Sequence, residues 1–297
     1  MLHFPVLLEE SVDFLVNDIN GHYIDCTFGR GGHSELILNK ISNKGFLSSF
    51  DKDPEAYKHG LNLDKKNFEI HHDSFQNIGK YFKKESIDGI IYDLGTCSTH
   101  FDNPKRGFSF NKEGPLDMRF NNTTGMPFSK WLEDAKKNDI SEVLYKFGDE
   151  KHAKLIANAI YAAKNEHSIS NTLELAKIIK DVYPEKYNKI HPATKSFQAF
   201  RILINNELDE LKRSLENAEE IIKRNGFIVT IAFHSLEDNI VKNFFRPSIK
   251  SFPKDIPINN EEKRKFKCIA KKIRASEAEV NINPRSRSAI MRVFQKT

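Results

Sequence analysis

The sequence lacks the features that mark several classes of protein. It has only three cysteines, Cys26, Cys97 and Cys268, which form no CxxC pair, so neither a disulfide framework nor a zinc site is indicated. Its 14 glycines and 11 prolines in 297 residues are too few for a disordered chain. No apolar run approaches the ~20 residues that span a bilayer, and the first residues do not resemble a signal peptide. The simplest prediction is a folded cytoplasmic enzyme with no membrane partner and no metal.

Charge is distributed unevenly along the chain. The net charge is +5, but residues 242–297 hold 15 Lys/Arg against 5 Asp/Glu, a local +10, so the remaining 241 residues carry −5. A basic segment on a mildly acidic body indicates a polyanionic partner, because Lys and Arg that neutralise phosphates release condensed counterions. Composition alone also allows a solvated lysine-rich tail.

The order of predicted elements indicates an α/β protein with a helical insertion. Strand-like runs alternate with helices such as 34–41, which is typical of a parallel sheet with crossover helices; the strands are expected at 22–26, 45–50, 68–72 and 87–93. A helical block without strand signals follows, with helices expected at 131–147, 150–164 and 172–182. The α/β pattern then returns, with one long helix at 196–224, a strand at 227–233 and an antiparallel hairpin of 268–273 with 288–294. We therefore expect a core domain made of 1–104 and 196–297, interrupted by a helical domain at 105–195.

A glycine-rich turn follows the first predicted strand, in the segment Gly29-Arg30-Gly31-Gly32-His33-Ser34. Glycines let the backbone approach a ligand closely, and the helix that follows presents free amide groups. The acidic residue expected about 20 residues on, as a partner for ribose hydroxyls, is Asp51. Packing alone remains the alternative explanation for the glycines.

The residues of this turn limit the classes of ligand that it can bind. The sixth position of a GxGxxG pattern is Ser34 here, and no Walker lysine follows, so oxidoreductase and NTPase functions are disfavoured. Asp25, ahead of the glycines, favours a ligand with a cationic amino-acid end, as S-adenosylmethionine has. Asp73 and Phe75, just past the third strand, are placed to reach an adenine ring, although Phe75 equally fits an ordinary core position.

The fourth predicted strand ends with Asp93, at the sheet edge where open α/β folds bind ligands. Methyl transfer to an exocyclic base amine needs a nearby group that accepts a hydrogen bond or the proton, and Asp93 is a candidate. The amino-methyltransferase signature, Asp or Asn followed by Pro-Pro and an aromatic residue, is not present. The sequence reads Asp93-Leu94-Gly95-Thr96-Cys97-Ser98 instead, which indicates a more particular family.

Several stretches taken together resemble the bacterial ribosomal RNA small-subunit methyltransferase H family, also called MraW. They run from Asp25 to Ser34, Arg106 to Phe110, Gly114 to Arg119, His191 to Thr194, Phe197 to Ile202, Asn206 to Leu208, Phe233 to Asp238 and Asn283 to Ser288. The resemblance covers essentially the whole chain. It implies a Rossmann-like class I S-adenosylmethionine-dependent methyltransferase sheet with an inserted helical domain. It also implies that a cytoplasmic enzyme methylates N4 of a cytidine in the decoding centre of 16S rRNA.

The family's functional residues can be carried over where the motifs match. The cofactor contacts then fall on Gly31, Gly32, His33, Asp51, Phe75 and Asp93. A further contact position, commonly Gln in the family, is His100 here, which differs in shape and titration. Thr96-Cys97 replaces the usual Val-Ser, and Cys97 is interpreted as a packing residue because N4 methylation needs no thiol nucleophile.

Two further motifs carry open alternatives. Ser235 and Asp238 have the spacing of a capping box, and the absence of a GxSxG elbow disfavours a hydrolase. His234 either lines the cytosine pocket, as a second catalytic candidate beside Asp93, or is structural. Asp117 and Arg119 either close over cofactor and base or serve turn chemistry.

The expected macromolecular partner is 16S rRNA in the small ribosomal subunit. Basic residues near the C-terminus are expected to contact its backbone: Lys271, Lys272, Arg274, Arg285 and Arg287. The target cytidine is expected to leave its stack and enter a cleft between core and insertion. Two alternatives stay open, a same-fold methyltransferase for another RNA or DNA base or a protein, and a non-catalytic RNA-binding relic. Whether the substrate is naked or assembled, and whether a homodimer forms, also stays open.

Overall fold

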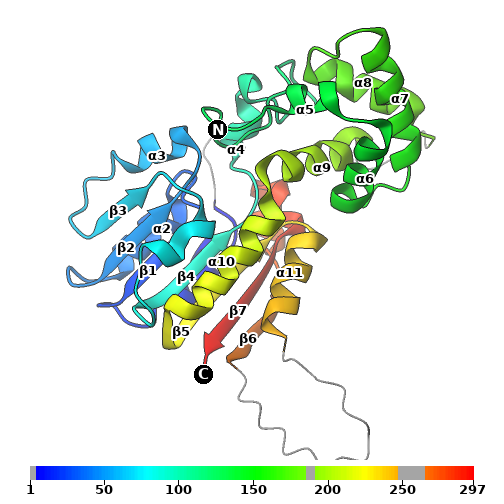
Figure 1. The fold of residues 1–297 in the computed structure, drawn as a ribbon. Helices are drawn as coiled ribbons and strands as arrows, with labels where there is room; N and C mark the ends of the chain where they lie inside the picture. Colours follow the sequence, from blue (N-terminus) through cyan, green and yellow to red (C-terminus); the bar gives the residue numbers. More distant parts are fainter. Residues whose placement is uncertain (1–4, 185–190, 247–264) are drawn as a thin grey trace, which may run out of the picture. The chain divides into compact units, whose positions relative to one another are not determined.

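The computed structural model describes residues 5–184, 191–246 and 265–297, and the chain divides into two compact units (Figure 1). Unit 1 comprises residues 1–95 and 208–297, and unit 2 comprises residues 96–207. The insertion predicted at 105–195 falls within unit 2, which also includes α4 (Ser98–Asp102) and α9 (Ala193–Asn205). Among the described residues, no helix is long and apolar enough to cross a membrane.

Unit 1 is built on a seven-stranded sheet in the order β3-β2-β1-β4-β5-β7-β6 (Figure 1). The strands are β1 (His22–Asp25), β2 (Phe46–Phe50), β3 (Phe68–His71), β4 (Ile87–Asp93), β5 (Ile222–Ala232), β6 (Phe266–Ile273) and β7 (Ile290–Lys296). β1 to β5 pair in parallel, whereas β7 runs antiparallel between β5 and β6. The predicted parallel α/β sheet and the C-terminal hairpin are confirmed. Because the strand order reverses at β1, with β2 on one side and β4 on the other, a ligand site is expected at its carboxyl end.

Alternating side chains of the strands cover both faces of this sheet. Tyr23 of β1 and Ile91 of β4 are fully buried in one apolar cluster with α1 (Leu8–Leu15) and α2 (Gly32–Lys40). Their neighbours Ile24 and Ile90 point to the opposite face, in a cluster with α10 (Glu207–Ile221) and α11 (Ser235–Phe245). The period-two alternation thus produces three layers, with helices on each face.

Short helices complete unit 1 around the strand ends. They are α3 (Pro54–Gly60), the 3-10 turns η1 (Phe75–Lys80) and η3 (Pro284–Ser288), and α12 (Glu277–Ile282). Asp53 caps α3 by accepting a hydrogen bond from the backbone N–H of Glu55, and Pro54 occupies the first helical position. These residues follow the end of β2, so the cap fixes the path of the chain beside the predicted ligand site.

The prediction of one long helix at 196–224 is wrong. α9 ends at Asn205 and α10 begins at Glu207, because Asn206 has left-handed backbone angles (φ 52°, ψ 34°). Apolar residues continue at helical spacing on both sides, so periodicity alone does not reveal the break. Asn is among the few residues that adopt this conformation at low cost. A bidentate ion pair joins Arg201 before the break to Glu207 after it, with contacts of 2.8 and 3.0 Å.

Unit 2 is helical, with α5 (Phe128–Asp134), α6 (Lys137–Gly148), α7 (Ala153–Glu166) and α8 (Thr172–Val182) packed with α9 around one apolar core. α8 has the predicted bounds and is capped by Asn171. The helix predicted at 131–147 is in fact two helices, since Ala135 is extended (φ −63°, ψ 132°) and ends α5. The preceding part contains α4 and the 3-10 turn η2 (Pro104–Arg106).

Candidate cofactor site

The glycine turn joins β1 to α2 in a conformation that requires glycine. Gly31 is the N-cap of α2 and has a positive φ of 79°, and a Cβ there would lie 2.9 Å from the ring of Phe28. A Cβ on Gly32 would lie 2.0 Å from Cγ of Pro5. Packing therefore accounts for both glycines by itself. Their contact with a cofactor stays a prediction that depends on the neighbouring groups.

Ser34, at the position of the third glycine in a dinucleotide motif, has a bonding role. Its hydroxyl donates to Oδ2 of Asp25 at 2.6 Å, while the backbone N–H of Thr27 donates to Oδ1 at 3.0 Å. Burial raises the pKa of the Asp25 carboxyl to about 6. Asp25 thus stabilises the turn through these two hydrogen bonds. It would act on a ligand through its charge. The sequence shows Ser34 only as a departure from GxGxxG, not as the partner of Asp25.

Asp51 holds the same turn from the end of β2. Its Oδ2 accepts from the backbone N–H of Gly29 and its Oδ1 from that of Asp53, both at 2.8 Å. Burial raises the pKa of the Asp51 carboxyl to about 6. Each carboxylate oxygen has a second lone pair, so Asp51 can also accept from ligand hydroxyls. The next residue, Lys52, forms a 2.8 Å ion pair with Glu210 of α10, which anchors this strand end.

Asp93 ends β4, on the other side of β1. Its backbone N–H donates to the hydroxyl of Thr27 at 2.8 Å, which ties the strand end to the glycine turn. Oδ2 of Asp93 lies 3.7 Å from Nδ1 of His33, and Nε2 of His33 lies 3.2 Å from the carbonyl oxygen of Val6. The His33 side chain is 6% exposed and that of Asp93 19%. The predicted residues His33 and Asp93 are therefore direct neighbours.

Phe75 begins η1, after β3. Two residues that sequence reasoning missed, Ser214 and Tyr92, position it. The hydroxyl of Ser214 donates to the Phe75 carbonyl at 3.0 Å and lies 2.8 Å from the hydroxyl of Tyr92. The Tyr92 ring meets the Phe75 ring edge-on, with centroids 5.8 Å apart. Asp73 accepts from the Ser74 N–H, from the side chain of Asn77 in η1 and from the hydroxyl of Tyr81 just after it, so these contacts stabilise that turn.

Three carboxylates thus stand at the carboxyl ends of adjacent strands: Asp51 directly after β2, Asp25 at the end of β1 and Asp93 at the end of β4. Their negative charge suits a ligand with cationic groups and hydroxyls and opposes a polyphosphate. No group of three or more His, Cys, Asp or Glu side chains that could hold a metal occurs in the described parts of the chain. The sheet and this donor set fit a nucleoside cofactor with a sulfonium and an amino-acid end, which defines the class of S-adenosylmethionine-dependent methyltransferases.

Comparison with known proteins gives the particular family. The model of the MraW methylase family matches residues 1–297, so the chain belongs to the MraW methylase family. The chain is 43% identical over 303 aligned residues to "Ribosomal RNA small subunit methyltransferase H" of Marinomonas sp. (strain MWYL1). That alignment covers 99% of this chain and 97% of the relative. The resemblance noted in the sequence is confirmed, as are the methyltransferase activity and S-adenosylmethionine as the cofactor.

Solved structures also align over nearly the whole chain. One, assigned as an rRNA methylase from Clostridium thermocellum, has a TM-score of 0.45 at 12% identity and covers 99% of this chain and 98% of that one. Another, assigned as a methyltransferase from Streptococcus mutans and determined in complex with SAH, has a TM-score of 0.39 at 15% identity and full coverage of both chains.

His234 follows β5 as the N-cap of α11, which corrects the predicted capping box. The box is formed by His234 with Glu237, not by Ser235 with Asp238: Oε2 of Glu237 accepts from the Phe233 and His234 backbone N–H groups. Nδ1 of His234 accepts from the Glu237 N–H at 3.4 Å, and Nε2 lies 3.0 Å from Oε1 of Glu237. Nδ1 thus serves the cap, whereas the contact of Nε2 with Glu237 lacks the geometry of a hydrogen bond. A catalytic role for His234 stays a prediction.

Asp238 has a different role from the predicted one. Its carboxylate binds the guanidinium of Arg292 on β7, with contacts of 2.6 and 3.1 Å. Although burial opposes the effect, Arg292 lowers the pKa of the Asp238 carboxyl. The pair ties α11 to the antiparallel part of the sheet.

His100 and the pair Asp117–Arg119 belong to unit 2, whereas the other predicted cofactor residues belong to unit 1. His100 is 6% exposed, with its ring 5.0 Å from those of Phe108 and Phe120. Arg119 forms a bidentate ion pair with Asp117, with contacts of 2.9 and 2.6 Å, and donates to the carbonyls of residues 124 and 125. These contacts favour turn chemistry for that pair. The cofactor contact of His100 stays a prediction.

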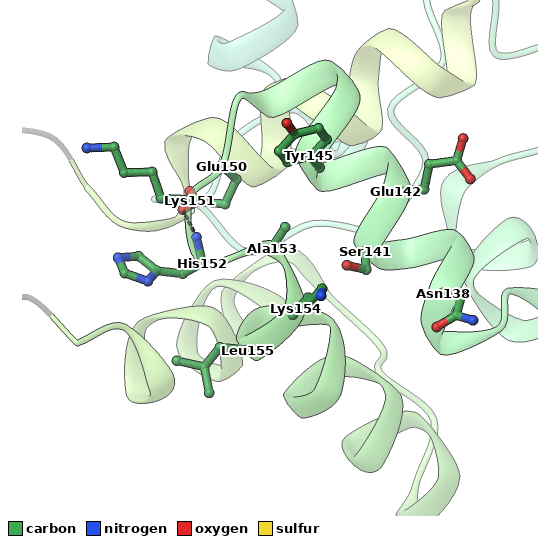
Figure 2. Close-up of a pocket in the computed structure, with 10 residues that line it drawn as sticks. All are labelled: Asn138, Ser141, Glu142, Tyr145, Glu150, Lys151, His152, Ala153, Lys154 and Leu155. Atoms are coloured by element: carbon green, nitrogen blue, oxygen red, sulfur yellow. Dashed lines mark hydrogen bonds between the residues drawn. The ribbon is translucent and has the colours of Figure 1, made fainter.

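Unit 2 also has a surface pocket of about 580 Å³, lined by α6, the start of α7 and the residues between them (Figure 2). Tyr145 is one of its lining residues and is 74% exposed. Lys151 and Lys154 bring positive charge, while the buried Glu150 carboxylate accepts from the His152 backbone N–H at 3.0 Å. None of the predicted cofactor residues lines this pocket.

Proposed function

We propose that the protein transfers the methyl group of S-adenosylmethionine to N4 of a cytidine in the decoding centre of 16S rRNA. The observation that carries this proposal is the 43% identity, over nearly the full length of both chains, to a protein named as a small-subunit rRNA methyltransferase. The specific base and atom come from the family resemblance. The acidic strand ends support a cationic cofactor, and Asp93 supports an amine as the methyl acceptor.

In this reaction the chain binds and orients the cofactor and the cytidine, and it accepts the proton that the cytidine amine loses. The cofactor supplies an activated methyl group on sulfur. Asp51 accepts hydrogen bonds from ribose hydroxyls, and Phe75 packs against the adenine. Gly31 and Gly32 let the backbone come close, and His33 and Asp93 line the cationic end. The Asp93 carboxylate accepts the hydrogen bond, and then the proton, of the cytidine amine, which makes the nitrogen lone pair available.

The substrate is bound through its backbone and its exposed base. All five basic residues predicted for RNA contact are exposed and belong to unit 1: Lys271, Lys272, Arg274, Arg285 and Arg287. Part of the basic segment, 247–264, lies outside the described residues. Phosphate contacts position the RNA, and the target cytidine must leave its stack to reach Asp93. The exposed Tyr145 with Lys151 and Lys154 adds a surface on which unstacked RNA bases can pack.

The proposal places the reaction in the cytoplasm, where small ribosomal subunits are assembled. The homodimer considered from the sequence stays a prediction, which sedimentation of the purified protein tests.

The experiment is a methyl-transfer assay with labelled S-adenosylmethionine on small subunits, free 16S rRNA, other RNA and DNA. We expect label in one cytidine of 16S rRNA, with loss of label for Asp93→Ala while cofactor-free thermal unfolding is unchanged. Label only in DNA or protein would favour the same-fold alternative, and cofactor binding without any transfer would favour a non-catalytic relic. Unchanged turnover of Asp93→Ala would remove Asp93 from the mechanism.

A further inference from the structure

The side chain of His33 stands between two hydrogen-bond acceptors. Nε2 lies 3.2 Å from the Val6 carbonyl oxygen, and Nδ1 lies 3.7 Å from Oδ2 of Asp93. Both acceptors are unable to donate, but only the Val6 carbonyl lies within hydrogen-bond distance, so the proton of the neutral ring belongs on Nε2. The lone pair of Nδ1 is then directed to the carboxylate. The ring therefore presents an acceptor, not a donor, to Asp93.

The Val6 carbonyl is fixed in place from several directions. Pro5 packs against Gly32, at a distance that excludes any Cβ there. The backbone N–H of Leu7 donates to Oε1 of Glu279 on α12 at 2.8 Å, and Leu7 itself has a positive φ of 52°. This segment is thereby held against the start of α2, where His33 is the second residue. The tautomer of His33 is set by a carbonyl that has little freedom to move.

We propose that His33 is a positioning residue that takes the reaction's proton from Asp93, an inference that rests on the proposed methyl transfer. The N4–methyl bond forms as the methyl–sulfur bond breaks, and the bond pair stays on sulfur. The proton of N4 passes to the Asp93 carboxylate and from there to Nδ1 of His33. The imidazolium then donates from Nδ1 to Asp93 and from Nε2 to Val6, so both acceptors are satisfied. Asp93 returns to its ionised state inside a largely buried site.

The charged groups around His33 favour this arrangement. Asp93 faces the ring from β4, and the segment ahead of α1 presents the Val6 carbonyl. Two acidic groups lie on elements that contact the residues beside His33: Asp25 of β1, whose carboxylate accepts from Ser34, and Glu279 of α12, which accepts from Leu7. Because the ring is 6% exposed, the field of Asp93 acts on it with little screening by water.

The first test reads the ring directly and needs neither cofactor nor RNA. Protein labelled with ¹⁵N-histidine reports the tautomer and titration of each ring by NMR, and His33→Gln identifies the His33 signals by their loss. We expect the neutral ring to carry its proton on Nε2, and to titrate at lower pH in Asp93→Asn than in wild type. A proton on Nδ1 in the neutral ring, or an identical titration in Asp93→Asn, would overturn the proposal.

The second test separates proton transfer from cofactor binding. In single-turnover methylation we expect His33→Gln to slow the chemical step by about tenfold to a hundredfold. Its S-adenosylmethionine affinity should change far less, and its rate should lose the acidic limb of the wild-type pH profile. His22→Gln, a partly buried histidine of β1, is the matched control. A loss of affinity equal to the loss of rate, or an unaltered pH profile, would reduce His33 to a cofactor contact. If the wild-type protein methylates no RNA, the proposed function fails. The NMR experiment still tests the interaction of His33 with Asp93, because it needs neither cofactor nor RNA.

Discussion

Cofactor affinity should depend on the ionisation of Asp51. Burial raises the pKa of this carboxyl to about 6, well above its ordinary value of 3.8, so it is ionised at pH 7.5 and mostly protonated at pH 5. A protonated carboxyl is a poorer acceptor for ribose hydroxyls and no longer attracts the sulfonium. If the cofactor binds only the form with Asp51 ionised, about one protein in eleven is competent at pH 5, so this carboxyl alone lowers the affinity about tenfold between pH 7 and pH 5.

Isothermal titration of the cofactor-free protein with S-adenosylmethionine from pH 7.5 to pH 5 measures this dependence. The matched control is Asp51→Asn, which keeps the shape of the side chain but does not titrate. We expect weaker binding at pH 7.5 and a shallower pH dependence in this variant. Asp25, with a pKa also raised to about 6 by burial, accounts for the dependence that remains. Equal affinity at both pH values in wild type would refute the assignment of Asp51 to the cofactor.

Three further predictions concern the turn, the helix break and the basic tail. Gly32→Ala should lower the free energy of unfolding by about 1–3 kcal/mol in urea denaturation, because the new methyl group meets Pro5; an unchanged midpoint would show that the segment moves freely. Asn206→Ala should cost about 1–2 kcal/mol, whereas Asn206→Gly should cost less, since only the first forces an alanine into left-handed angles; equal losses would contradict this. Replacing Arg285 and Arg287 with Ala should weaken RNA binding in a filter assay and flatten its salt dependence; the same slope would assign both to folding.

The placement of Asp51 and Asp93 at strand ends could be predicted from the sequence, because parallel strands place their carboxyl ends at one edge. Their contact with the cofactor stays a prediction. Asp51 and Asp93 each stand at the end of a predicted strand, and the strand lengths locate them at that edge within a residue. The pattern also gave the bounds of β4 and α8 correctly. Periodicity and strand order are local properties of the chain, so they can be inferred without knowing the tertiary contacts.

What could not be predicted depends on backbone groups brought together by tertiary folding. The Val6 carbonyl has no sequence signature, yet it determines which nitrogen of His33 carries the proton. The capping box was misplaced by one residue, because a histidine is an unusual N-cap and Ser235 had the more familiar spacing. Asn206 interrupts a continuous helical pattern through its backbone angles alone.

Mapping methylated cytidines in 16S rRNA from cells with and without this gene tests the central claim most directly. The account predicts one N4-methylated cytidine in the decoding centre that disappears with the gene. It also predicts that this cytidine returns when the wild-type gene is supplied, but not when the Asp93→Ala gene is supplied. An unchanged methylation pattern in the cells without the gene, or restoration by Asp93→Ala, would contradict it.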